Sequence, residues 1–169
     1  MTLVAFYRGE RTDDRGRYIE DILKRDDAWL EYTHDYIQWL FPIRTVGVNP
    51  NAPPADDATI EAFCSDPTLR ASLRWSLARM LNFYGLRWEG DDEIVRSNDF
   101  EHKRQWLTPG NHNHLRLTRI MTSLRLLGEP DAAAALYRCL LEIDADERAA
   151  GRQPISDATL AYWEDAIRP

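Results

Sequence analysis

The sequence has little cysteine, no long apolar run and no excess of basic residues. Only two of its 169 residues are cysteine, Cys64 and Cys139. They lie far apart in helical patterns, and with no secretion signal they are expected to be reduced thiols in the core of a cytoplasmic protein. No apolar stretch approaches the roughly 20 residues that a membrane span requires. The N-terminus has neither the basic leader nor the cleavage site of a signal peptide.

The charge balance is acidic, with a net charge of −7 and an isoelectric point near 5.1. Proteins that bind nucleic acid normally carry a basic excess, so no nucleic-acid partner is expected. A Gly-rich phosphate loop, a nucleophilic Ser elbow and a paired-carboxylate motif are all absent from the sequence. We therefore expect no cofactor and assign no catalytic residue.

What is present is typical of a globular helical protein. Hydrophobic residues make up 44% of the chain, and six tryptophans can anchor a core. Residues 1–169 are expected to form one domain. No alternation is long enough for a sheet. The fold prediction is all-α, a single irregular helical bundle of about seven or eight helices.

Capping residues mark several of the expected helices. Asp66 followed by Pro67 starts the clearest one, and Gly85 ends it. Further helices are expected after Asp26 or Asp27, after Asp56 or Asp57, and after Ser156. The remaining expectations are a strand or extended anchor at Leu3–Tyr7, helices at Tyr18–Lys24 and Phe100–Leu107, a loop at Trp88–Val95, a long helix from Asn111 or Asn113 to Leu127, and a helix from Pro130 that gives way to a charged loop at Asp144–Pro154.

The most informative stretch is Glu31–Pro42, with the sequence EYTHDYIQWLFP, here called the signature segment. Thr33 can cap a helix of about two turns that Pro42 stops. Its apolar residues cover more than one face, so the helix is expected to be mostly buried. Its polar residues fall on one strip, formed by His34, Asp35 and Gln38.

A second polar stripe follows on the long helix that precedes Leu127. Helical spacing places His112, Arg116, Arg119 and Ser123 on one face. Two arginines near a helix N-terminus suit a carboxylate or a phosphate. The alternative is structural, with an arginine paired to Asp35 or another acid and locking two helices together. His102, His112 and His114 are the only cluster of histidines that could suggest zinc, but residues two apart on a helix point in different directions, so no metal site is assigned.

The segment HDYIQWLFP at His34–Pro42 resembles the signature of the conserved region of the opioid growth factor receptor family. The resemblance extends to Phe83–Gly85 (FYG) and to residues 112–120, which match the family's HNxLRxTRI run, with His114 and Leu117 as departures. Vertebrate members are receptors for the opioid growth factor, a Met-enkephalin peptide, and are associated with the nucleus and its membrane. The resemblance therefore implies a peptide-binding role.

The functional prediction combines the two polar sets. We expect a soluble binding or interaction module with a cleft for a peptide or a small anionic ligand, and a protein partner is a further alternative. The candidate binding residues are His34, Asp35, Gln38, His112, Asn113, Arg116 and Arg119. One alternative is an enzyme that acts on a small anionic substrate in the same cleft. Another is a purely structural polar clamp with no ligand.

Overall fold

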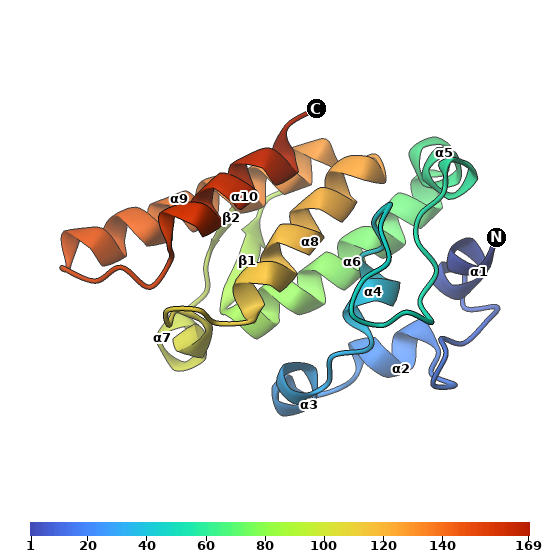
Figure 1. The fold of residues 1–169 in the computed structure, drawn as a ribbon, viewed down its shortest axis with the longest axis horizontal. Helices are drawn as coiled ribbons and strands as arrows, with labels where there is room; N and C mark the ends of the chain where they lie inside the picture. The colour runs from blue at the N-terminus through green and yellow to red at the C-terminus, as the bar shows by residue number, and fades with distance from the viewer. The chain divides into compact units, whose positions relative to one another are not determined.

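A computed structural model describes residues 1–169, with ten α-helices, one 3-10 helix and one two-stranded sheet (Figure 1). The prediction of an all-α chain with seven or eight helices is therefore wrong in its helix number and in omitting strands, although helices dominate. In chain order the elements are α1 (Thr2–Tyr7), α2 (Ile19–Leu23), α3 (Asp27–Tyr32), α4 (Ile37–Leu40), α5 (Asp57–Ser65), α6 (Pro67–Tyr84), β1 (Leu86–Glu89), β2 (Glu93–Arg96), α7 (Phe100–Lys103), η1 (Arg104–Trp106), α8 (Asn113–Leu126), α9 (Pro130–Ala149) and α10 (Asp157–Ile167).

The chain forms two compact units, which are described separately. The N-terminal unit comprises Met1–Arg79 and Leu126–Gly128, and the C-terminal unit comprises Met80–Arg125 and Glu129–Pro169. The expectation that residues 1–169 form one domain stays a prediction. No helix in either unit combines the length and the apolar character needed to cross a membrane.

Short side chains start the helices where the sequence indicated. The carboxylates of Asp26 and Asp56 accept hydrogen bonds from the main-chain N–H groups three residues on, as does the hydroxyl of Ser156. Asp66 accepts one from the N–H of Thr68, and Gly85 adopts a φ of 76° just after α6. These signals are local, because each cap satisfies an N–H that the first turn of its own helix leaves unpaired.

In the N-terminal unit, the first apolar stretch is helical where a strand or extended anchor was expected. Four of the six residues of α1 are buried, and the helix packs against α5. The Tyr7 ring meets Phe63 edge to face with centroids 5.1 Å apart, and its hydroxyl donates to the Leu40 carbonyl oxygen and the Ser76 side chain. A short apolar run buried on all sides carries no periodicity that separates helix from strand, which explains the error.

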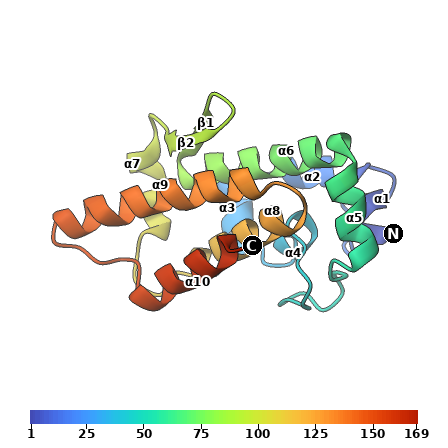
Figure 2. The ribbon, with the colours of Figure 1, turned by 90° about the horizontal axis from the view of Figure 1, so that it is seen from above.

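In the C-terminal unit, residues 86–96 form an antiparallel hairpin where the sequence predicted a loop for most of this stretch. Leu86 pairs with Arg96 and Glu89 with Glu93, and the turn contains Gly90 at a φ of 64°. Figure 2 shows the hairpin beside α9, which packs against β2. An ion pair of 2.6 Å between Arg96 and Asp146 supports this contact. Strands of four residues are too short for their alternation to be recognised.

The last two long helices, α9 and α10, lie side by side (Figures 1 and 2). α9 continues to Ala149, so the loop predicted for Asp144–Pro154 is wrong over its first half. Arg148 explains the extension, because it pairs with Asp144 one turn earlier and with Asp157 at the start of α10, both at 2.9 Å.

The two cysteines are free thiols in different environments. Cys139 is buried in α9, and this burial is the main cause that raises its pKa to about 12. Cys64 in α5 is exposed, so the expectation of two core thiols holds for Cys139 alone.

Candidate functional site

The signature segment does not form the two-turn helix predicted for it. Thr33 ends α3 in an extended conformation, with φ and ψ of −102° and 131°, and the next helix, α4, holds only Ile37–Leu40. His34 and Asp35 therefore precede α4, and the predicted helical strip with Gln38 does not exist. The apolar residues of the segment, from Tyr36 to Phe41, are buried as expected.

Gln38 differs from the other two predicted residues of this segment in being almost fully buried. Its side-chain oxygen has no hydrogen-bond partner. Gln38 does not line the pocket described below. The structure thus separates it from His34 and Asp35.

Asp35 is held by two arginines of the N-terminal loop. Its carboxylate accepts hydrogen bonds from Arg15 at 3.1 Å and from Arg17 at 2.9 Å. Arg17 also pairs with Asp13 at 2.7 Å, and its guanidinium lies 5.3 Å from the Trp29 ring centre. Although burial acts in the opposite direction, the hydrogen bonds from Arg17 to Asp13 and Asp35 raise the pKa of Arg17. The arginines on Asp35 thus come from the N-terminal loop, and a pair between Asp35 and an arginine of the second polar stripe, Arg116 or Arg119, stays a prediction.

A second set of hydrogen bonds fixes the loop that faces Asp35. The Asn49 amide donates to Asp14 at 3.0 Å and to the Asp35 carbonyl oxygen at 2.9 Å, and its own oxygen accepts from the N–H of Asn51. The Trp39 indole N–H donates to Asp14 at 2.7 Å. Partial burial acts to raise the pKa of Asp14, but the hydrogen bonds from Asn49 and Trp39 outweigh it and lower that pKa. These contacts fix the loop to the signature segment.

An open pocket of about 290 Å³ lies between these two parts of the N-terminal unit, and we call it the signature pocket. Its wall contains groups of both charges, since Arg15 and Asp35 face it together with the His34 imidazole. Val48 adds an apolar side chain that is 85% exposed. The full lining is Arg15, His34, Asp35, Val48, Asn49, Pro50 and Asn51. Such a wall can bind a ligand that has both charged and apolar groups.

The predicted residues of the C-terminal unit lie at the start of α8 and along it. Asn113 and Arg116 are buried. The Asn113 side-chain oxygen accepts from the Tyr84 hydroxyl at 3.3 Å and from Arg116 at 3.5 Å. Arg119 is partly buried, and this burial lowers its pKa to about 10, so it remains a cation at neutral pH. A shared site of His112, Asn113, Arg116 and Arg119 with the signature segment stays a prediction.

His114 has a packing role in the C-terminal unit. Its ring meets Trp106 and Trp163 edge to face with centroids 6.4 and 6.0 Å away. Its Nε2 lies 2.9 Å from the Trp106 carbonyl oxygen, and its own carbonyl oxygen accepts from the Trp163 indole. Burial lowers the pKa of His114, which favours the neutral ring. No group of three or more His, Cys, Asp or Glu side chains is arranged to hold a metal ion.

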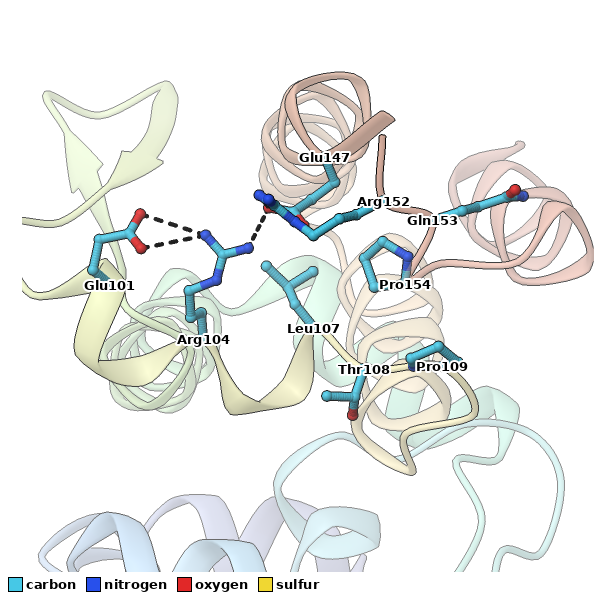
Figure 3. A pocket seen from close by; sticks show the side chains of 9 residues that line it. All are labelled: Glu101, Arg104, Leu107, Thr108, Pro109, Glu147, Arg152, Gln153 and Pro154. Atoms are coloured by element: carbon cyan, nitrogen blue, oxygen red, sulfur yellow. Dashed lines mark hydrogen bonds and ion pairs between the residues drawn. The ribbon is translucent and has the colours of Figure 1, made fainter. Parts of the chain in front are cut away.

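A second and larger pocket, of about 780 Å³, lies wholly in the C-terminal unit, and we call it the arginine pocket. Figure 3 shows Arg104 between Glu101 and Glu147, with Arg152 also meeting Glu147. The lining residues are Glu101, Arg104, Leu107, Thr108, Pro109, Glu147, Arg152, Gln153 and Pro154. None of them was among the candidates from sequence, because the pair of Arg104 with Glu147 joins residues 43 positions apart and leaves no local pattern.

Glu147 is the centre of the arginine pocket. Its side chain is 6% exposed and accepts from Arg152 at 2.7 and 3.1 Å and from Arg104. The hydrogen bonds from Arg152, together with those from Arg104, lower the pKa of Glu147 to about 2 against the opposing effect of burial. Glu147 is therefore an anion at neutral pH, and it fixes both guanidinium groups.

The model of the opioid growth factor receptor (OGFr) conserved region matches residues 1–169. The chain belongs to this family. It is 41% identical over 145 residues to the opioid growth factor receptor of Homo sapiens, which covers 82% of this chain and 21% of the receptor. It is 37% identical over 159 residues to opioid growth factor receptor-like protein 1 of Mus musculus, which covers 90% of this chain and 33% of the relative.

The chain thus spans about a fifth to a third of the length of these relatives. No solved structure matches it. The resemblance read from the signature segment is confirmed. The comparisons give the family of the chain, and they do not assign a ligand to either pocket.

Proposed function

We propose that this opioid growth factor receptor conserved region is a binding module whose signature pocket takes a short peptide. The observation that carries the proposal is the wall of that pocket, which combines Arg15, His34 and Asp35 with the exposed Val48. A short peptide offers matching groups, since it has a charged end at each terminus and apolar side chains between them.

The rigidity of the wall supports binding. Asn49 is bonded to Asp14 and to the main chain of Asp35, and Asp35 itself is fixed by Arg15 and Arg17. A wall that is already ordered loses little conformational entropy when a ligand binds, which favours affinity. The pocket is small, so it would take one or two residues of a peptide and leave the rest in solvent.

The names of the relatives agree with this proposal. One of them is named an opioid growth factor receptor, and the other an opioid growth factor receptor-like protein. Met-enkephalin, the peptide that the resemblance implies, has two charged termini, two aromatic side chains and a thioether. The proposal includes two further points. This chain would act as a receptor, and it would work in the cytoplasm or with a protein partner.

The test is a titration of the 169-residue chain with Met-enkephalin. Binding is measured by calorimetry and, for His34, by the NMR signals of the imidazole. We expect His34→Ala and Arg15→Gln each to weaken binding by about tenfold or more, because each removes a polar contact in a preformed pocket. Glu142→Gln is the control, since it removes an exposed charge of α9 in the other unit. Binding that is unchanged by both pocket variants would remove the signature pocket from the proposal.

The ion pairs of Asp35 favour a second candidate, the structural clamp without a ligand. Both oxygens of its carboxylate already accept from an arginine. On this interpretation Asp35→Ala lowers stability, and Met-enkephalin produces no shift of the His34 signals. The same titration therefore separates the two candidates.

A further inference from the structure

The arginine pocket holds two guanidinium groups on one buried carboxylate, and its rim carries a second, weakly held carboxylate. We propose that this pocket binds the C-terminal carboxylate of a peptide, and that Glu101 occupies the place of that carboxylate in the free protein. This site is distinct from the signature pocket, because all of its residues lie in the C-terminal unit.

The charge of the pocket selects a monoanion. With Glu101 in place, the two arginines and the two glutamates of the pocket sum to zero charge. Once Glu101 turns away into solvent, the group of Arg104, Glu147 and Arg152 keeps a net charge of +1. A peptide carboxylate balances this charge, whereas a phosphate dianion would leave a negative charge beside Glu147. Guanidinium groups also bind carboxylates in a planar, paired geometry, which suits this choice.

Both guanidinium groups are positioned before any ligand arrives. Arg152 donates to the Glu147 carboxylate through two side-chain nitrogens. Its main-chain N–H also donates to the carbonyl oxygen of Glu147. Arg104 lies in η1 and also donates to Glu147 (Figure 3). Binding a ligand here requires little further ordering of these side chains, which is the condition for useful affinity.

Glu101 shows where an incoming carboxylate would bind. Its two oxygens lie 3.3 and 3.4 Å from the same nitrogen of Arg104, longer than the charge-assisted hydrogen bonds to Glu147. The Glu101 side chain is 75% exposed, so this pair contributes little stability and is easily replaced. The hydrogen bond to Glu147 is the main cause that raises the pKa of Arg152, and the negative charge of Glu101 adds to this rise. Glu101 also pairs with Arg104, so it is within electrostatic reach of both arginines.

The rest of the pocket suits the residue that bears the carboxylate. Leu107 and Pro154 are buried and Pro109 adds an exposed ring, so an apolar surface borders the two arginines. Figure 3 shows the Leu107 side chain pointing toward the region between Arg104 and Arg152. An apolar C-terminal side chain would contact this surface while its carboxylate meets the guanidinium groups. The ligand class is therefore a peptide with a free C-terminus and an apolar last residue.

The experiment compares two probes that differ only in the terminal group, acetyl-Gly-Leu and acetyl-Gly-Leu-amide, by calorimetry on the whole chain. We expect the acid to bind at least about tenfold more tightly than the amide, since the amide carries no charge for the arginines. Inorganic phosphate is the third probe, and we expect it to bind more weakly than the acid. Equal affinities of acid and amide, or tighter binding of phosphate, would overturn the proposal.

Glu101→Gln provides a test that does not depend on weakening the protein, because this side chain is exposed. Removal of the internal carboxylate should tighten binding of the acid about three- to tenfold and leave the amide unchanged. Glu142→Gln, which removes another exposed charge, from α9, should change neither. Arg152→Gln should weaken the acid about tenfold while circular dichroism shows the chain folded.

The result for Glu101→Gln decides the role given to that residue. If this variant binds the acid no more tightly than the wild type, Glu101 does not occupy the ligand's place and the proposal is wrong. His34→Ala serves to separate the two sites, because it changes the signature pocket alone and should leave binding of acetyl-Gly-Leu unaltered. A loss of Met-enkephalin binding in His34→Ala therefore says nothing against the arginine pocket.

Discussion

Asp13 is expected to contribute more to stability than Asp35, although only Asp35 belongs to the signature segment. The Asp13 side chain is fully buried. One of its oxygens accepts from the main-chain N–H groups of Arg15 and Arg17, both at 2.9 Å, and the other pairs with the Arg17 side chain at 2.7 Å. The Asp35 side chain is 27% exposed and accepts only from side chains.

The magnitudes follow from these contacts. Breaking a buried ion pair costs about 3–5 kcal/mol. Because Arg17 keeps Asp35 as a partner when Asp13 is lost, the cost of losing the ion pair should lie at or below the low end of this range. Two main-chain hydrogen bonds add about 1 kcal/mol each, so Asp13→Ala should lower the free energy of unfolding by about 4 kcal/mol in all. Asp35→Ala should cost about 1–2 kcal/mol, because solvent reaches its carboxylate and Arg17 keeps Asp13.

The assay is urea denaturation at pH 7, followed by tryptophan fluorescence and by circular dichroism. Asp13→Asn should fall between the two alanine variants, because it retains an oxygen for the main chain and loses the charge. Asp57→Ala is the control, and its exposed pair with Arg44 should contribute less than about 0.5 kcal/mol. An Asp35→Ala variant that loses as much stability as Asp13→Ala would refute this assignment of the network.

Three further predictions concern the C-terminal unit. Glu147→Gln should destabilise the chain by about 2–3 kcal/mol at pH 7. Since the pKa of Glu147 is about 2, the stability difference between the wild type and this variant should shrink in urea melts as the pH falls from 4.5 toward 2. Burial lowers the pKa of His114 below that of the unfolded chain, so stability should fall as the pH drops below 6.5, and His114→Gln should lose this component. Gly85→Ala should cost about 2–4 kcal/mol by thermal melting, because a φ of 76° is strained and a Cβ would lie 2.9 Å from the Phe100 Cα; Gly110→Ala, with similar φ and open space, should cost about 1–2 kcal/mol.

The parts of the fold that were predictable are those whose cause lies within a few residues. Asp26, Asp56 and Ser156 each cap a helix by a contact three residues along the chain, and Gly85 ends α6 through its own backbone conformation. Such signals survive in any context, because they satisfy groups that the helix itself leaves open.

The parts that failed depend on distant partners. The hairpin of β1 and β2 is supported by α9, whose contact residue Asp146 lies 50 positions after Arg96. The pairs of Asp35 with Arg15 and of Arg104 with Glu147 also join segments that share no sequence pattern. Tertiary contacts decide these features, and one sequence read alone does not contain them.

The signature segment shows how a specific motif can mark a family without marking its ligand. Its residues from Tyr36 to Phe41 are all buried, and α4 is too short to be stable alone. The Tyr36 hydroxyl donates to the Leu30 carbonyl oxygen, and the Trp39 indole donates to Asp14, so the packing of distant segments fixes this stretch. Most of the motif is therefore accounted for by packing. Under the proposed function, the motif would contact the ligand through the two positions that face the signature pocket, His34 and Asp35, and Asp35 is already paired with arginine. His34 is therefore the position of the motif whose variant tests that proposal with the least disturbance of the fold.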